Sequence, residues 1–119
     1  MIVVSLVLNI VVLVAVVGSL LANATWTVAA YGERTAARDI LVAIYVAILV
    51  GSGLLLVLDL VAPAPWVLGA VLGLLGVQIV YKVLTALTVR GALRNPVVIS
   101  NLGIALVHSV TVALTTGVL

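Results

Sequence analysis

Charge is scarce in this chain of 119 residues, because only 7% of them are Asp, Glu, Lys or Arg, whereas 66% are hydrophobic. Soluble domains carry about 25% charged and about 45–50% apolar residues. A soluble fold of this composition would have too few polar side chains to cover its surface. We therefore expect a single domain, residues 1–119, that is embedded in a membrane.

Cysteine is absent, and histidine occurs once, at position 108. The lack of cysteine excludes disulfides, thiolate metal sites and cysteine nucleophiles. A single histidine excludes a bis-histidine haem site and a histidine-rich metal site, so no metal site is predicted. Axial ligation of a haem or chlorophyll by His108 is an open alternative, but a hydrogen-bonded structural role is the prediction for this side chain.

Acidic residues are also few: Glu33, Asp39 and Asp59 all lie at or near the ends of apolar runs. There is no glycine loop to cradle phosphate and no domain outside the membrane to hold a substrate. These absences argue against an enzyme acting alone. The five basic residues do not imply nucleic-acid binding, because they report membrane topology instead.

What the chain does have is four long apolar runs separated by short polar stretches. About 20 helical residues cross a bilayer core. Gly32 is placed to end the first run, the prolines of residues 62–65 interrupt the chain between two runs, and Asn95-Pro96 favours a helix start. The sequence predicts an all-α, integral membrane four-helix bundle with short loops and helices at about 2–30, 36–61, 66–89 and 97–119.

A signal peptide is the rival interpretation of the first run, since Ala22-Asn23-Ala24 resembles a small-residue cleavage site. No Lys or Arg precedes this run, although signal peptides begin with a positively charged region. We therefore expect a retained helix.

Basic residues predict the orientation of the bundle. The second loop and both tails contain no Lys or Arg, and the arginines fall in the first and third loops, at positions 34, 38, 90 and 94. The positive-inside rule then predicts that loops 31–39 and 90–96 are cytoplasmic and that both termini are outside. The expected location is a prokaryotic plasma (inner) membrane.

Several side chains are expected to reach the membrane surface. Residues 33–39 are interpreted as a solvated loop of balanced charge, with contact to anionic headgroups as the alternative. Lys82 is expected to extend its stem and place its ammonium at the interface. The aromatic side chains are interpreted as an interfacial belt; they are Trp26, Tyr31, Tyr45, Trp66 and Tyr81.

Small residues recur at four-residue spacing on two of the predicted helices. Such spacing stacks them along one face, where they allow close approach of backbones. The pattern predicts that the helices at 36–61 and 66–89 pack closely. The residues concerned are Ala43, Ala47 and Gly51 on the first helix, and Gly69 and Gly73 on the second.

Polar residues form one stripe on each of the last two predicted helices: Gln78, Lys82 and Thr85, then Asn101, His108, Thr111 and Thr115. Polar groups buried in hydrocarbon need partners. We expect the stripes to face each other, or another protein, through hydrogen bonds of about 0.6–2 kcal/mol each. The alternative is a water-filled path or ligand pocket lined by Gln78, Lys82, Asn101 and His108.

The absent catalytic chemistry and the small-residue faces favour a non-catalytic accessory subunit of a larger membrane complex, whose partners are lipids and other membrane subunits. No cofactor is predicted. One alternative is a small homo-oligomeric transporter or channel with a polar path between the third and fourth helices. A second alternative is a haem- or pigment-binding subunit that uses His108.

The transporter alternative can be compared with a known family. The size and the four-helix count are similar to those of the small multidrug-resistance transporters. That family couples transport to a membrane-embedded glutamate in its first helix, whereas residues 2–30 contain no carboxylate. Transport in this chain would have to depend on Gln78, Lys82 and His108.

Overall fold

The computed structural model describes all 119 residues and contains helices but no strands. Two short helices, α2 (Thr25–Tyr31) and the 3₁₀ helix η1 (Ala92–Arg94), precede α3 and α5 respectively. The predicted all-α fold with four apolar helices is confirmed. The helices long and apolar enough to cross a membrane are α1 (Ile2–Leu21), α3 (Ala36–Val61), α4 (Pro65–Thr88) and α5 (Pro96–Thr116).

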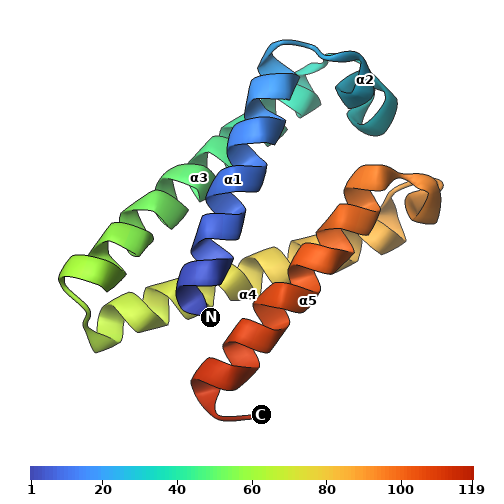
Figure 1. Ribbon diagram of the computed structural model, residues 1–119. Coiled ribbons are helices and arrows are strands. Elements are labelled where there is room, and N and C mark those ends of the chain that lie inside the picture. The colour runs from blue at the N-terminus through green and yellow to red at the C-terminus, as the bar shows by residue number, and fades with distance from the viewer.

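The long helices form two antiparallel pairs, in which α1 packs chiefly against α3 and α4 against α5 (Figure 1). The chain reverses direction at each connection, so α2 and η1 lie at one end and the termini lie towards the other. The Asn95 Nδ2 donates to the Ala30 carbonyl at 2.8 Å and joins α2 to the start of α5. Loops 31–39 and 90–96 therefore share one end of the bundle, while the cytoplasmic location of that end stays a prediction.

Local capping explains where the later helices begin. The Thr35 hydroxyl accepts a hydrogen bond from the Arg38 backbone N–H at 3.2 Å, and Asn95 Oδ1 accepts one from the Val97 N–H at 2.9 Å. Such caps satisfy backbone donors that have no partner inside the helix. Gly32 has a φ of 88° and ends α2, as its position in the sequence predicted.

The prediction of one helix over residues 2–30 is wrong, because α1 ends at Leu21 and α2 begins at Thr25. Asn23 between them has a φ of 51°, a left-handed conformation that Asn tolerates better than most residues. The Arg38 Nη2 donates to the Leu20 carbonyl at 3.1 Å and to Asn23 Oδ1 at 2.9 Å. This guanidinium stabilises the end of α1 and the turn that follows it.

Arg38 also corrects the interpretation of residues 33–39 as a solvated loop. Its side chain is only 4% exposed, and it donates to the Gly32 carbonyl at 2.9 Å and to the Thr27 hydroxyl at 3.4 Å in addition to the two acceptors above. Arg34 and Asp39 do lie on the surface, where they form an ion pair at 3.1 Å. The loop is therefore solvated on one side and anchored by Arg38 on the other.

The small residues do not mediate close packing of α3 against α4, so that prediction is wrong. Ala43, Ala47, Gly69 and Gly73 are exposed, and a Cβ added at either glycine would meet nothing within 4 Å. The reason is that α3 turns a different face inward, with its buried residues seven positions apart, and packs this face on α1. Figure 1 shows α3 and α4 diverging from the loop that joins them.

Candidate functional site

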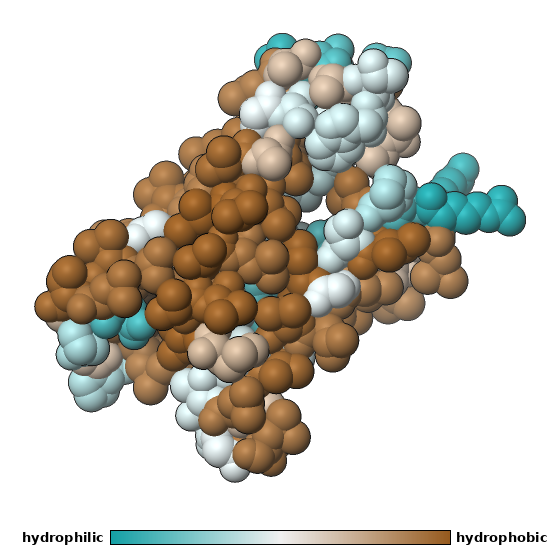
Figure 2. Space-filling view, in the orientation of Figure 1, coloured by the Kyte–Doolittle hydropathy of each residue, from teal (hydrophilic) through white to brown (hydrophobic).

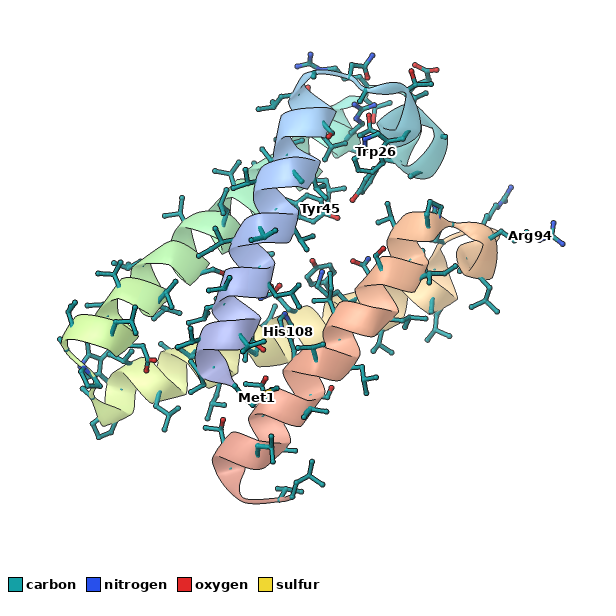
Figure 3. The ribbon with its side chains drawn as sticks, viewed as in Figure 1. Met1, Trp26, Tyr45, Arg94 and His108 are labelled. Carbon is teal, nitrogen blue, oxygen red and sulfur yellow. The ribbon has the colours of Figure 1, made fainter.

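A buried polar network joins α1, α3 and α5 around His108, whose side chain is fully buried. Its Nδ1 lies 3.1 Å from the Ser5 hydroxyl, and its Nε2 lies 3.0 Å from Asn9 Oδ1. The network continues from Asn9 Nδ2 to the Ser52 hydroxyl at 3.1 Å and from Ser5 to the Thr111 hydroxyl at 2.8 Å. Figure 3 shows His108 between α1 and α5.

The partners of His108 assign its tautomer. Asn9 Oδ1 only accepts, so Nε2 carries the proton and Nδ1 accepts from the Ser5 hydroxyl. Both ring nitrogens are thus engaged within the chain, and no side of the ring is open. This arrangement does not fit an axial ligand to a haem or chlorophyll, which would need a free nitrogen and space for the macrocycle beside it.

The Asn9–His108 contact predicts a measurable coupling free energy. In a double-mutant cycle of Asn9→Ala and His108→Ala, we expect a favourable coupling of about 0.6–2 kcal/mol in the free energy of unfolding, measured in mixed micelles. Ser109→Ala is the control partner, because Ser109 bonds only to the Ala105 carbonyl of its own helix. A coupling of Asn9 to His108 no larger than its coupling to Ser109 would contradict the network.

Lys82 is buried inside the protein, so its side chain does not extend to the protein surface as the sequence predicted. The side chain is 5% exposed, and its Nζ donates to Asn101 Oδ1 at 3.2 Å. The ammonium also lies 4.9 Å from the centre of the Tyr81 ring, within the range of a cation–π contact. These two partners hold the lysine between α4 and α5.

The predicted meeting of the two polar stripes occurs at this position and not along their whole length. The Asn101 Nδ2 donates to the Thr85 hydroxyl at 3.4 Å, so Asn101 bridges Lys82 and Thr85 of α4. His108 turns to α1 instead, and the buried Gln78 Nε2 makes no hydrogen bond. The four polar candidates therefore do not line one common path.

A cavity of about 500 Å³ lies next to the Lys82–Asn101 pair. Its apolar wall includes Val12 and Val16 of α1 and Ile104 and Val107 of α5, and Lys82 is the charged residue in its lining. Ligand pockets commonly span about 300–1,000 Å³. Figure 2 shows a hollow between the α1–α2 end and the start of α5, where the cavity meets the surface.

Aromatic side chains from α2 and α3 line part of this cavity. The Tyr31 and Tyr45 rings meet edge to face at 6.2 Å with their hydroxyls 3.3 Å apart, and Trp26 lies 6.4 Å from Tyr31. Burial, with a smaller contribution from Tyr45, raises the pKa of Tyr31, so its hydroxyl keeps its proton. The belt interpretation is wrong for Tyr45, which is buried against Leu13 of α1 (Figure 3).

The cavity lining contains one positively charged side chain, that of Lys82, and no carboxylate. Asp39 pairs with Arg34, and neither of the other two acidic residues lines the cavity. An ammonium has three donors, and one of those on Lys82 is bonded within the chain. The buried hydroxyl of Tyr81, which also lines the cavity, makes no hydrogen bond. The site can therefore donate hydrogen bonds to the oxygen atoms of an anion.

Four important polar residues were not singled out from the sequence as site residues: Ser5, Asn9, Arg38 and Ser52. Ser5 and Asn9 are four apart, a spacing that places both on one face of a helix. This spacing was a usable signal for a polar face on α1. Arg38 carried no such signal, because charged residues between apolar runs are ordinarily solvated.

Comparison of the chain with protein-family models, with curated proteins and with solved structures finds no match.

Proposed function

We propose that this chain is a membrane-embedded binding protein for a single-chain anionic amphiphile, of the class of long-chain carboxylates. The observation that carries the proposal is the buried Lys82 ammonium in the wall of an apolar cavity whose lining contains no carboxylate. The acid group lies at Lys82, and the hydrocarbon chain occupies the apolar part of the cavity.

The charge of Lys82 supports an anionic ligand. A buried ammonium is costly unless it is paired and hydrogen-bonded. Asn101 supplies one acceptor and the Tyr81 ring supplies a weak electrostatic contact, which leaves two N–H donors. A carboxylate accepts through two oxygens and forms the shorter, stronger charge-assisted hydrogen bonds. One compact ammonium matches one acid group.

The shape of the cavity supports a hydrocarbon chain. On α5, the lining runs from Pro96 to Val107, and its part from Asn101 beside Lys82 to Val107 rises about 9 Å along the helix axis. On α1, it reaches Leu8, so both walls of the deeper part are aliphatic. An acyl chain that moves from the bilayer into this cavity loses no contact with water. In the cavity it makes packing contacts that resemble those of the bilayer.

Tryptophan fluorescence tests this proposal, since Trp26 lines the cavity and Trp66, the other tryptophan, is exposed and outside its lining. In a Trp66→Phe variant in neutral nanodiscs, a brominated fatty acid is expected to quench Trp26 saturably, and the unbrominated acid to reverse the quenching. In Trp26→Phe, Trp66 is expected to report only partitioning into lipid. Equal, non-saturable quenching of both would refute the proposal.

A role as accessory subunit of a larger membrane complex is our second proposal. Exposed small residues favour it, because Ala43, Ala47, Gly69 and Gly73 leave space for the backbone of a neighbouring helix. The test is gentle extraction from the native membrane followed by native mass measurement. A partner of different mass is expected, and a homodimer or monomer without partner would contradict this role.

We propose which end of the bundle faces the cytoplasm from the distribution of its arginines. The two loops that carry Arg34, Arg38, Arg90 and Arg94 share one end of the bundle. This clustering supports a cytoplasmic location of that end in a prokaryotic plasma membrane, with both termini outside. The transporter alternative has less support, because α4 and α5 pack directly on each other and His108 faces α1.

A further inference from the structure

A second cavity, of about 460 Å³, lies at the end of the bundle where α2 approaches the start of α5. Arg90 and Arg94 line it on one side, and Trp26 with Ala29 and Ala30 of α2 line it on the other. We infer that this cavity binds a phosphate group at the membrane surface through the Arg90 and Arg94 guanidinium groups, with an anionic phospholipid headgroup or a free phosphate as its source.

The two arginines are available for a ligand. Both side chains are exposed, and neither makes a hydrogen bond or an ion pair within the chain, in contrast to Arg34 and Arg38. No carboxylate lines the cavity. A guanidinium presents several N–H donors in a planar fork that matches phosphate oxygens, and it binds them bidentately. Figure 3 shows Arg94 extending outward from η1.

The backbone around the arginines is held in place. Gly91 has a φ of 63°, which turns the chain sharply between Arg90 and η1. Asn95 then fixes the end of η1, because its Nδ2 bonds to the Ala30 carbonyl and its Oδ1 caps the Val97 N–H. The backbone positions of Arg90 and Arg94 relative to α2 are therefore set by the fold.

Trp26 gives this cavity the character of a membrane interface. The indole is 44% exposed and lines both this cavity and the one at Lys82. Tryptophan favours the headgroup level of a bilayer, and basic side chains at that level attract anionic lipids. The site does not depend on Lys82, so it stands independently of the function proposed above.

Native mass spectrometry of the full chain in phosphatidylcholine nanodiscs doped with phosphatidylglycerol tests the inference. We expect a phosphatidylglycerol adduct on the wild type and a loss of its affinity by tenfold or more, on the order of the effect of two interfacial charges, in Arg90→Gln/Arg94→Gln. Arg34→Gln, at the same end but paired with Asp39, and Lys82→Met are expected to keep the adduct. Circular dichroism checks that the variants fold.

Titrations with inorganic phosphate in phosphatidylcholine nanodiscs, with and without phosphatidylglycerol, separate the two sources. Binding of phosphatidylglycerol without competition by phosphate supports a lipid headgroup, and binding of phosphate with no lipid adduct supports a free phosphate; either requires the two arginines. Equal retention of phosphatidylglycerol by the double variant and the wild type, or an equal loss in Arg34→Gln, would overturn the inference.

Discussion

Replacing Arg38 by methionine is expected to lower the free energy of unfolding by about 3 kcal/mol or more. The guanidinium donates to four acceptors, on α1, in the turn after it, on α2 and in the loop before α3. Methionine keeps much of the apolar stem but donates to none of them. Because the Leu20 carbonyl is buried with this contact, the loss leaves an acceptor without a partner, which costs more than losing an exposed bond.

The matched control for this variant is Arg34→Met. Arg34 lies four positions away and pairs with Asp39 on the surface, with side-chain exposures of 62% and 54%. An exposed ion pair contributes about 0–1 kcal/mol, so this change is expected to alter stability little. Unfolding in mixed micelles followed by circular dichroism compares the two. Similar losses for Arg34→Met and Arg38→Met would show that Arg38 is not the anchor of the α1–α3 connection.

Replacing Lys82 by methionine is expected to weaken binding of a long-chain carboxylate by tenfold or more, which corresponds to about 1.4 kcal/mol. The ammonium is the charged group in the cavity lining, and hydrogen bonds to charged groups contribute about 1.5–3 kcal/mol. Methionine is apolar and similar in length, and replacing a buried charge by an apolar group is often tolerated. The fold is therefore expected to persist. The quenching of Trp26 by a brominated fatty acid measures the affinity.

A neutral ligand separates the charge of Lys82 from a structural effect. The wild type is expected to prefer the fatty acid over the fatty alcohol of equal length, and Lys82→Met is expected to bind the two alike. Ser100→Ala changes the same cavity without changing its charge, so it is expected to keep the wild-type preference. A preference for the acid that survives in Lys82→Met would show that the ammonium does not bind the acid group.

The sequence was sufficient for the parts of the fold that depend on local rules. Long apolar runs predict spanning helices whatever packs on them, and the helix start at Asn95 depends on a cap only two positions away. The shared end of the two arginine-bearing loops follows from the number of spans. Each of these features is set by composition or by near neighbours in the chain.

The features that the sequence did not predict depend on contacts between distant residues. The break after Leu21 is stabilised by Arg38, which bonds to Asn23 across 15 positions. Two polar stripes on the last helices predicted that these helices meet, but His108 pairs with Ser5 and Asn9 at the start of the chain. Periodicity tells which residues share a face of a helix, and it does not tell which neighbour that face contacts.

The same limit applies to the cavity. Lys82 near a helix end is ordinarily expected to reach the interface, because a flexible stem permits it. Asn101 lies 19 positions away in the chain, and only the packing of α4 on α5 brings its side-chain oxygen to the ammonium. Four of the five aromatic residues line the cavity for a similar reason, since α2 brings Trp26 and Tyr31 next to Tyr45 of α3 and Tyr81 of α4.

The contact between Lys82 and a bound acid group can be measured directly, because Lys82 is the only lysine in the chain. Lysine labelled with ¹⁵N at Nζ marks this one ammonium, and a long-chain fatty acid labelled with ¹³C at its carboxyl group marks the ligand. Rotational-echo double-resonance NMR in lipid bilayers is expected to give a nitrogen-to-carboxyl distance within about 4 Å, that of an ion pair. The absence of dipolar coupling at saturating fatty acid would contradict the proposed binding site.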